Sequence, residues 1–518
     1  MAATITTPTY QERAAEKRAN QLALIPPEWR LSPVPLVESH PDALAYIRRI
    51  LTPAEHALTE ETDITVLLRK LSSAELSSLE LTRAFAKRAA LAHQLTICCT
   101  EIFFEEAFAT AKEMDEYLAK TGTTVGPLHG LPVSIKDLFS VKGVDTSIGW
   151  VGLTNTPAPA DKSVARTLRR LGAVLYVKTN LPQSMMMSDS YNHVFGQCVN
   201  PFNRNLISGG SSGGESSLVA ARGSALGIGT DLGGSIRIPA SLCGLYGLSP
   251  TPGRHPYERG NPGQDIVRSV AGPMSCSLAT IERYMEALPC ASPWELDQHT
   301  APVPWRRSVA SLKAKRLRIG FLVDDGVVKV QPPIARAVQE VIAALKAAGH
   351  EGMSIASLSA VLNADKYLYE SEYLDRWTTS GIDALIMPNT PWVGYKPWTW
   401  VKSSAYVGYT SIWNLLGYAA LAVPATTVSR EKDIPCQEWL DHVPRNAGDK
   451  FNKEQCKSHR RYGIESCANF MIDDIDLVDG MPVGLQIVGG RFGEEKCVSV
   501  AKAIEQAMRW RDAARSSL

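Results

Sequence analysis

The spacing of hydrophobic positions predicts helices over most of the first 125 residues. Ser72-Ser73-Ala74-Glu75 has the spacing of a capping box. It precedes a helical repeat of apolar side chains at Leu79, Leu81, Phe85, Ala89 and Leu91. A second amphipathic pattern runs from Phe103 to Lys120, and Gly122 follows it as a terminator. We expect residues 1–70 to form an N-terminal helical arm.

Short apolar runs alternate with helical patterns along the rest of the chain. Continuous apolar runs of this length are typical of strands that are buried on both faces. Helical patterns at Ile334–Ala348 and Lys496–Met508 fall between such runs. The predicted strands are Pro132–Ile135, Ala173–Val177, Leu317–Leu322, Ala384–Met387, Ala420–Val423 and Val483–Val488. This alternation predicts an α/β protein with a large, mainly buried sheet.

The chain shows no internal repeat, low-complexity tract or obvious linker. We therefore expect a single domain over residues 1–518, in which 71–300 form the core and 301–518 complete the sheet. The most apolar stretch, Ala405–Ala425, contains Trp413, Asn414 and Pro424. These residues favour a buried core segment over a membrane span.

Charge and composition limit the kinds of molecule that we expect this protein to bind. The 518 residues are 45% hydrophobic, and 54 basic against 53 acidic residues give a net charge of +1. This balance gives no reason to expect nucleic acid or an anionic membrane, so a small neutral substrate is the expected partner. A homodimer is left open.

The ten cysteines are scattered, and the charged segment Met1–Leu24 does not have the pattern of a secretory signal. Free thiols in the cytoplasm are therefore expected. Cys436, His442, Cys456 and His459 do not have the spacing of a zinc site. We expect neither a metal nor a cofactor.

Two segments rich in glycine and serine carry the candidate chemistry, residues 207–216 and 227–239. Glycine turns cluster backbone N–H groups, and such clusters can bind the negative charge that develops during acyl transfer. Each segment also supplies serine hydroxyls. A flexible linker is the alternative, but the apolar stretch Leu218–Ile228 between the segments disfavours it.

Three short motifs compete in this region. The dinucleotide fingerprint fails because Leu232 stands where a third glycine is needed after Gly227 and Gly229. The Gly-Lys-Ser/Thr sequence of a phosphate-binding loop is absent. Gly210–Gly214 matches G-x-S-x-G, which leaves open a Ser-His-Asp esterase built on Ser212.

Three long motifs together resemble the amidase signature family over nearly the whole chain. They are the two glycine-serine segments and residues 126–137 (GPLHGLPVSIKD), and the resemblance extends to residues 481–490 (MPVGLQIVGG). Glu215 and the segment Gly408–Leu416 are most similar to acetamidase-type general amidases and fatty-acid amide hydrolases. The resemblance implies a large mixed β-sheet covered by helices on both faces, and an enzyme that hydrolyses carboxylic amides.

The resemblance also implies roles for single residues. Lys136 matches the family's catalytic lysine, Ser211 its bridging serine and Ser235 its nucleophile. The backbone N–H groups of Leu232, Gly233, Gly234 and Ser235 match the oxyanion hole. Around them we expect an Asp231–Arg237 ion pair that braces the loop, a loop-stabilising Ser212 and a structural Asp137.

The chemistry suits these residue types. A serine hydroxyl needs a base to take its proton, and lysine can be that base only when it is neutral. Burial lowers the pKa of a lysine from its ordinary value of about 10.4. Spacing alone would instead favour a solvated Lys136 at the end of a strand.

One departure from the family concerns residues 350–383, where relatives carry a longer helical segment that helps line the acyl pocket. A degenerate, non-catalytic family member is therefore the third hypothesis.

Overall fold

The computed structural model describes residues 8–257, 266–311, 316–355, 366–399, 406–455 and 475–508. The chain divides into two compact units. The first comprises Met1–Gly229, Pro256–Pro262 and Ala287–His299, and the second comprises Thr230–His255, Gly263–Glu286 and Thr300–Leu518. The expectation of a single domain over residues 1–518 stays a prediction.

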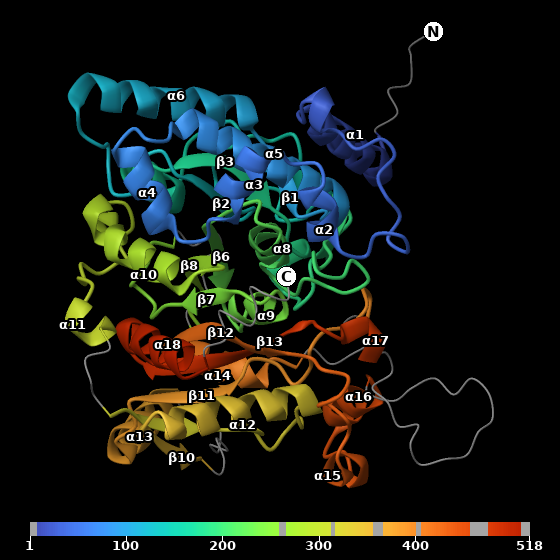
Figure 1. Cartoon of the computed structure of the whole chain (residues 1–518), viewed down its shortest axis with the longest axis vertical. Coiled ribbons are helices and arrows are strands. Elements are labelled where there is room, and N and C mark those ends of the chain that lie inside the picture. The colour runs from blue at the N-terminus through green and yellow to red at the C-terminus, as the bar shows by residue number, and fades with distance from the viewer. Residues whose placement is uncertain are drawn as a thin grey trace, which may run out of the picture. The chain divides into compact units, whose positions relative to one another are not determined.

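The first unit contains a mixed group of strands centred on β2 (Figure 1). β2 pairs in parallel with β3 on one side and with β6 on the other, and β1 pairs with β3 antiparallel. All five residues of β2 are buried. The strands are β1 (Cys99–Ile102), β2 (Pro132–Lys136), β3 (Val174–Thr179) and β6 (Gly227–Asp231), with a separate pair β4 (Tyr191–Asn192) and β5 (Gly196–Gln197).

Helices pack against these strands. α5 and α6 contact each other, and α5, α6, α7 and α8 contact β2 or β3. The helices are α1 (Tyr10–Ala23), α2 (Ala43–Arg48), α3 (Pro53–Glu60), α4 (Ile64–Ser72), α5 (Ser78–Thr96), α6 (Phe104–Thr121), α7 (Ser163–Arg170) and α8 (Gly213–Ala220). Short 3-10 turns lie at Pro27–Trp29, Val151–Leu153, Gln183–Met185, Leu288–Ala291 and Pro293–Glu295.

The ends of α5 and α6 follow local rules, with one correction to the predicted start. The capping box predicted at Ser72–Glu75 is wrong, because Ser72 is the last residue of α4. The side chain of Ser77 caps α5 instead and accepts a hydrogen bond from the N–H of Glu80. The same Ser-x-x-Glu spacing recurs five residues later, which explains the error. α6 ends at Gly122 with φ +68°, as predicted.

The second unit contains a longer mixed group of strands. β12 and β13 pair antiparallel, β7 and β11 flank them antiparallel, and β9 and β10 continue in parallel beyond β11. β8 pairs with β7. The strands are β7 (Tyr246–Ser249), β8 (Val270–Ser275), β9 (Arg318–Phe321), β10 (Glu351–Ser354), β11 (Ala384–Pro388), β12 (Ala419–Thr427) and β13 (Pro482–Gly490).

Helices α12 and α18 contact each other and pack on β11, β12 and β13, and α9 packs on β7, β12 and β13. The helices are α9 (Arg237–Leu242), α10 (Leu278–Ala287), α11 (Arg307–Ala310), α12 (Pro332–Ala347), α13 (Lys366–Ser380), α14 (Gly408–Leu416), α15 (Gln437–Asp441), α16 (Ala447–Gln455), α17 (Ile475–Val478) and α18 (Glu494–Met508). The six predicted strands correspond to β2, β3, β9, β11, β12 and β13. The α/β class with a mixed sheet packed by helices is confirmed.

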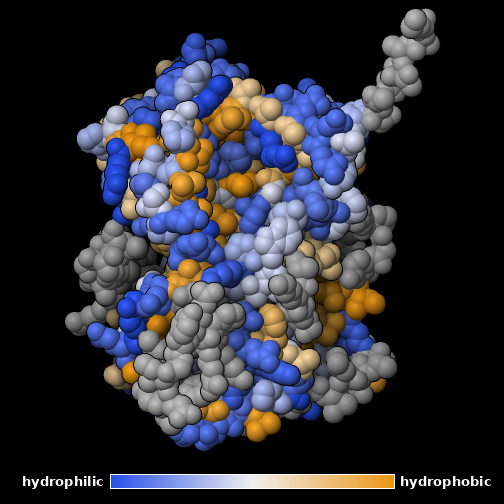
Figure 2. All heavy atoms as spheres, turned by 90° about the vertical axis from the view of Figure 1, so that its right-hand side faces the viewer, coloured by the Kyte–Doolittle hydropathy of each residue, from blue (hydrophilic) through white to orange (hydrophobic). Residues whose placement is uncertain are grey.

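The apolar stretch Ala405–Ala425 divides, over its described residues, into α14 and the first part of β12. Trp413 and Leu421 in it are fully buried, as expected for a core segment. No helix in the described ranges is both long and apolar enough to cross a membrane. On the face drawn in Figure 2, hydrophilic side chains alternate with hydrophobic patches.

Candidate active site

Lys136 is the last residue of β2, and its side chain is completely buried. The hypothesis that it is a solvated lysine is therefore wrong. A charged side chain is rarely buried in this way unless it has a specific partner. Its Nζ donates hydrogen bonds to the Oγ atoms of Ser211 at 2.8 Å and Ser212 at 2.9 Å. The first unit thus brings Lys136 together with both serines of the first glycine-serine segment.

Ser211 and Ser212 are held immediately before α8. Ser212 is its N-cap residue, both serines are buried, and the peptide bond between Gly210 and Ser211 is cis. The glycines beside them are needed for close packing, because a Cβ atom at Gly210 would lie 2.5 Å from the carbonyl oxygen of Asp189. The linker alternative is therefore wrong.

The esterase hypothesis needed an apolar strand directly before Ser212. Residues 198–211 form turns and an isolated bridge between Val199 and Ile207, without a strand. The nucleophile elbow at Ser212 is therefore wrong. Ser212 contacts Lys136 directly, which is a closer involvement than the loop-stabilising role expected from the sequence.

Asp137 pairs with a different lysine. Its Oδ1 lies 3.0 Å from Nζ of Lys178, and its Oδ2 accepts a hydrogen bond of 2.8 Å from the N–H of Ile148. Both side chains of this ion pair are buried. These contacts agree with the structural role expected for Asp137.

The second unit contains the segment that leads from β6 to α9. Asp231 and Arg237 form a buried ion pair of 3.0 Å there. Arg237 also donates to Oδ1 of Asn414 at 2.7 Å and to Oε1 of Gln486 at 2.8 Å. Burial by itself would raise the pKa of Asp231, but the charge and hydrogen bonds of Arg237, with that of Asn414, outweigh it and lower the pKa. Asn414 and Gln486 were not identified from the sequence.

This ion pair shapes the predicted oxyanion loop. The N–H of Gly234 donates to Oδ1 of Asp231 at 2.8 Å, so this donor is already used. The N–H groups of Leu232, Gly233 and Ser235 donate to no acceptor in the described part of the second unit. These three N–H groups remain available to bind an oxyanion. Gly234, whose φ is +125°, instead fixes the turn.

Thr410 of α14 supports the same turn. Its Oγ1 donates to the carbonyl oxygen of Gly233 at 2.5 Å, and a side chain at Gly234 would collide with it. Ser235 follows the turn and is partly exposed, whereas Ile236 and Arg237 are buried. The predicted nucleophile therefore lies on a braced turn at the start of α9.

Glu215 in α8 was noted in the sequence only as a family marker. Its carboxyl group is fully buried and accepts hydrogen bonds from the hydroxyls of Ser134 and Thr179. Burial, the largest effect, raises its pKa to about 7, against the lowering effects of these two hydroxyls and of Lys136. The signal available in the sequence was a single acidic residue within an otherwise small and apolar helix.

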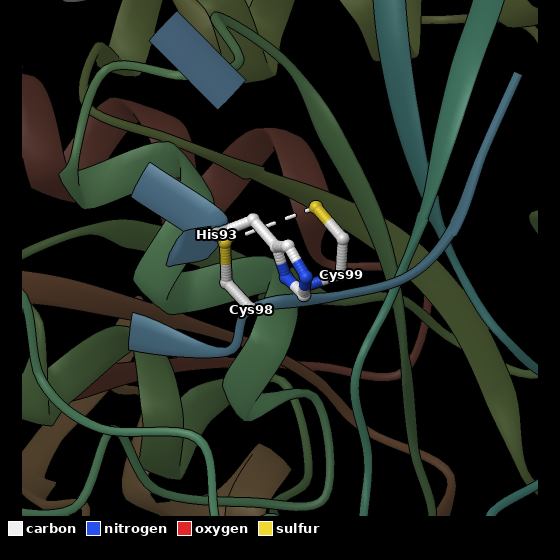
Figure 3. Close-up of side chains that lie close together, drawn as sticks. All are labelled: His93, Cys98 and Cys99. Atoms are coloured by element: carbon white, nitrogen blue, oxygen red, sulfur yellow. Dashed lines mark hydrogen bonds between the residues drawn. The ribbon is translucent and has the colours of Figure 1, made fainter. Parts of the chain in front are cut away.

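Figure 3 shows the cluster of His93, Cys98 and Cys99, which join α5 to β1. Their potential ligand atoms lie within 4.8 Å of one another. The hydrogen bond with Cys98, and then burial, raise the pKa of Cys99 well above its usual range. A thiol binds a metal as the thiolate, so a metal at this cluster would have to displace the proton of Cys99. Among the four residues whose spacing does not fit a zinc site, His442 pairs with Asp449 at 2.7 Å, and Cys456 and His459 lie outside the described residues.

Comparison with known proteins identifies the family. The family model described as Amidase matches residues 80–371. An acetamidase of Emericella nidulans is 34% identical, over 96% of this chain and 98% of its own, and Amidase 1 of Gibberella moniliformis is 35% identical over 88% and 95%. A solved structure of a fatty acid amide hydrolase is 30% identical, with a TM-score of 0.85 over 96% of this chain and 94% of that chain. The chain therefore belongs to the amidase family of amide-hydrolysing enzymes.

Proposed function

We propose that this enzyme hydrolyses carboxylic amides through a covalent acyl-enzyme, with Ser235 as nucleophile, Ser211 as proton relay and Lys136 as base. The observation that carries the proposal is the buried contact of 2.8 Å between Nζ of Lys136 and Oγ of Ser211. The two hydroxyls that accept hydrogen bonds from Nζ are neutral, so loss of the lysine proton leaves neither of them with an unpaired charge. Such a lysine is suited to general-base catalysis.

In the first half-reaction, Oγ of Ser235 attacks the amide carbonyl carbon, and its proton passes through Ser211 to Lys136. The negative charge on the carbonyl oxygen is bound by the N–H groups of Leu232 and Gly233, with that of Ser235. When the carbon–nitrogen bond breaks, Lys136 returns the proton through Ser211 to the leaving nitrogen. Ammonia or an amine departs, and the acyl group stays on Ser235.

In the second half-reaction, water attacks the acyl-enzyme. Ser211 and Lys136 take a proton from the water and then return it to Oγ of Ser235, so the free acid leaves and the enzyme is restored. Asp231 and Arg237 take no part in these proton transfers. We propose that they hold the turn from Leu232 to Ser235 in place.

The order of the strands supports this assignment. β6 runs parallel to β2, with Ile228 paired to Ile135, the residue before Lys136. The carboxyl ends of parallel strands meet at one edge of a sheet, where α/β enzymes commonly place their sites. Ser235 follows the carboxyl end of β6, and Lys136 is the carboxyl end of β2.

The substrate class is proposed from the relatives and from chain length. The relatives include an acetamidase and a fatty acid amide hydrolase. The alignment with the acetamidase extends over 564 positions, more than the 518 residues of this chain, so that relative carries segments that this chain lacks. We propose short aliphatic and aryl amides, with little selection for long acyl chains.

Labelling with a fluorophosphonate tests the function. The probe should attach to Ser235, and Ser235→Ala should lose both labelling and amide turnover while it remains folded. Ser212→Ala is the matched control, and it should still be labelled at Ser235. Labelling at Ser212, or amide turnover by Ser235→Ala, would overturn the proposal, and absence of any labelling or turnover would favour a non-catalytic family member.

A further inference from the structure

Glu215 lies next to the proposed base, yet the reaction described above gives it no task. It is fully buried in α8, and Lys136 is the cation that acts on it. A buried carboxyl group in this place can decide the charge of the lysine, because an opposite charge nearby favours the protonated amine. The inference below rests on the proposed role of Lys136.

The carboxyl group of Glu215 sits over the face of the strands that also carries Lys136. Ser134, which donates to its Oε1, is two residues before Lys136 on β2 and so points to the same face. Thr179, which donates to Oε2, is the residue of β3 paired with Lys136. The two hydroxyls that hold the carboxyl group therefore flank Lys136 directly.

Gly227 makes room for this arrangement. It is the residue of β6 paired with Ser134, and a side chain there would overlap Oε1 of Glu215. The carboxyl group is thus enclosed between α8 and three strands, β2, β3 and β6.

A count of hydrogens shows that this enclosure accommodates the protonated acid. Ser134 Oγ contacts both Glu215 Oε1 and Ser224 Oγ, the latter at 2.9 Å, and Ser224 Oγ donates to the carbonyl oxygen of Leu226 at 2.8 Å. Each hydroxyl has one hydrogen to donate. Ser134 donates to the ionised carboxyl group; when the carboxyl group is protonated it can donate to Ser134 instead, because Ser134 can then donate to Ser224 and Ser224 to Leu226.

The other titratable groups near Glu215 are neutral. Burial raises the pKa of Tyr176 on β3 well above its usual range, and the hydrogen bond with Cys98, followed by burial, does the same for Cys99 on β1. Glu215 itself adds to both shifts. Lys136 is therefore the group whose charge responds to that of Glu215.

We propose that Glu215 is a positioning residue for Lys136: it carries a proton up to neutral pH and so lets the lysine give up its own. An ionised Glu215 would hold the ammonium form of Lys136, which cannot accept the proton of Ser235. A neutral Glu215 keeps the hydrogen bonds that enclose the site without adding that charge.

The pH dependence of kcat/KM in Glu215→Gln tests this role. The side-chain amide of the variant is neutral at every pH. At pH 6 the carboxyl group of wild-type Glu215 is neutral as well, so kcat/KM of the variant should match that of the wild type within about twofold. At pH 8.5 the wild-type carboxyl group is ionised and opposes loss of the lysine proton, and the variant should be at least threefold more active. Equal enhancement at pH 6 and 8.5, or an equal loss at both, would overturn the proposal.

Glu101→Gln is the matched control. Glu101 is also a buried carboxyl group whose pKa burial raises to about 7, but Nζ of Lys17 donates to it at 2.9 Å. Its replacement should leave the pH profile of kcat/KM unchanged. A change like that of Glu215→Gln would show that the effect is not specific to the neighbourhood of Lys136.

A second measurement needs no turnover. In a Ser235→Ala background, the melting temperature of Glu215→Gln relative to its parent should rise as the pH increases from 4.5 to 8, because only the parent must bury an ionising group. A constant difference would contradict the inference even if Ser235 proved not to be the nucleophile.

Should Glu215→Gln fail to fold, Ser134→Ala in the same background should move the stability loss to higher pH, because it removes a hydrogen bond that lowers the pKa of Glu215. An unmoved pH dependence would contradict the inference in that case.

Discussion

Two buried basic side chains, Lys136 in the first unit and Arg237 in the second, have opposite kinds of partner. Lys136 donates to the hydroxyls of Ser211 and Ser212, whereas Arg237 contacts the carboxylate of Asp231. A carboxylate partner stabilises a cation, and arginine in any case keeps its proton. The difference separates a lysine that can act as a base from an arginine that can only brace a loop.

Lys178, on the strand next to that of Lys136, provides the same contrast. Lys178 lies opposite the carboxylate of Asp137 at 3.0 Å, although it is buried like Lys136 and lies on the neighbouring strand. Burial alone therefore does not mark the proposed base. The marker is burial against hydroxyl groups.

Substitution of Lys136 should give the largest effect on activity. Lys136→Met should lower kcat/KM by roughly a thousandfold or more, because loss of a member of a catalytic triad has effects of this order or larger. Lys136→Arg should not restore activity, since guanidinium keeps its proton. Steady-state kinetics check this, and near-native turnover by the arginine variant would exclude a lysine base.

Substitution of Arg237 should instead act on stability. Arg237→Met leaves Asp231 buried without its partner, and breaking such a pair costs about 3–5 kcal/mol of unfolding free energy. Lys136→Met should cost much less, because its hydroxyl partners are neutral. Urea denaturation of the two variants compares them directly, and equal losses would contradict the distinction drawn here.

The next largest effect is the loss of stability in acid that comes from the Asp231–Arg237 ion pair. The pKa of Asp231 is lowered in the folded protein, so its stabilising contribution is present above the unfolded pKa of about 3.9. It is lost as the pH falls below that value toward the lower folded pKa. Asp231→Asn should therefore lose less stability than the wild type between pH 4.5 and 3, measured as the change in denaturation midpoint. An identical change in both proteins would show that the pair does not respond to pH in this range.

The smallest effect concerns the acyl group. Each methylene buried in a closed pocket would add up to about 0.8 kcal/mol of binding, or roughly fourfold in kcat/KM. We propose that the interval 350–383 is shorter than in the family, and we therefore expect kcat/KM to change less than tenfold from acetamide to dodecanamide. A hundredfold rise along the series would show that a closed acyl channel exists.

From the sequence we expect aromatic side chains such as Tyr191 or Trp413 to help hold short and aryl amides, and the structure distinguishes these two residues. Trp413 is fully buried, its Nε1 donates to the carbonyl oxygen of Tyr409 at 3.1 Å, and its ring packs against those of Tyr373 and Tyr418. It is a core residue, so the expectation that it binds substrate is wrong. Tyr191 of β4 is partly exposed, and its role stays a prediction.

The sequence predicted the elements whose signals are local. β12 and β13 are apolar runs, and α6 ends at a glycine, so their patterns needed no knowledge of the fold. β6 was missed because Gly-Ile-Gly-Thr-Asp has the composition of a loop, and only its pairing with β2 makes it a strand.

The sequence predicted which residues make up the candidate site, but not the contacts that these residues make. Lys136, Ser211 and Ser235 came from motifs, whereas spacing alone favoured a solvated lysine. The contacts of Asn414 and Gln486 with Arg237 and the enclosure of Glu215 depend on segments far apart in the sequence. No local pattern encodes such contacts.

The measurement closest to the central claim is the rate of fluorophosphonate labelling at Ser235 against pH in the wild type, Lys136→Arg and Ser212→Ala. A hydroxyl-bound lysine base predicts fast labelling of the wild type that rises with pH, and labelling of Ser212→Ala at the same residue. Lys136→Arg should react at less than about one hundredth of the wild-type rate at every pH. Wild-type rates in Lys136→Arg, or a label on Ser212, would contradict the assignment of Lys136 as the base that activates Ser235.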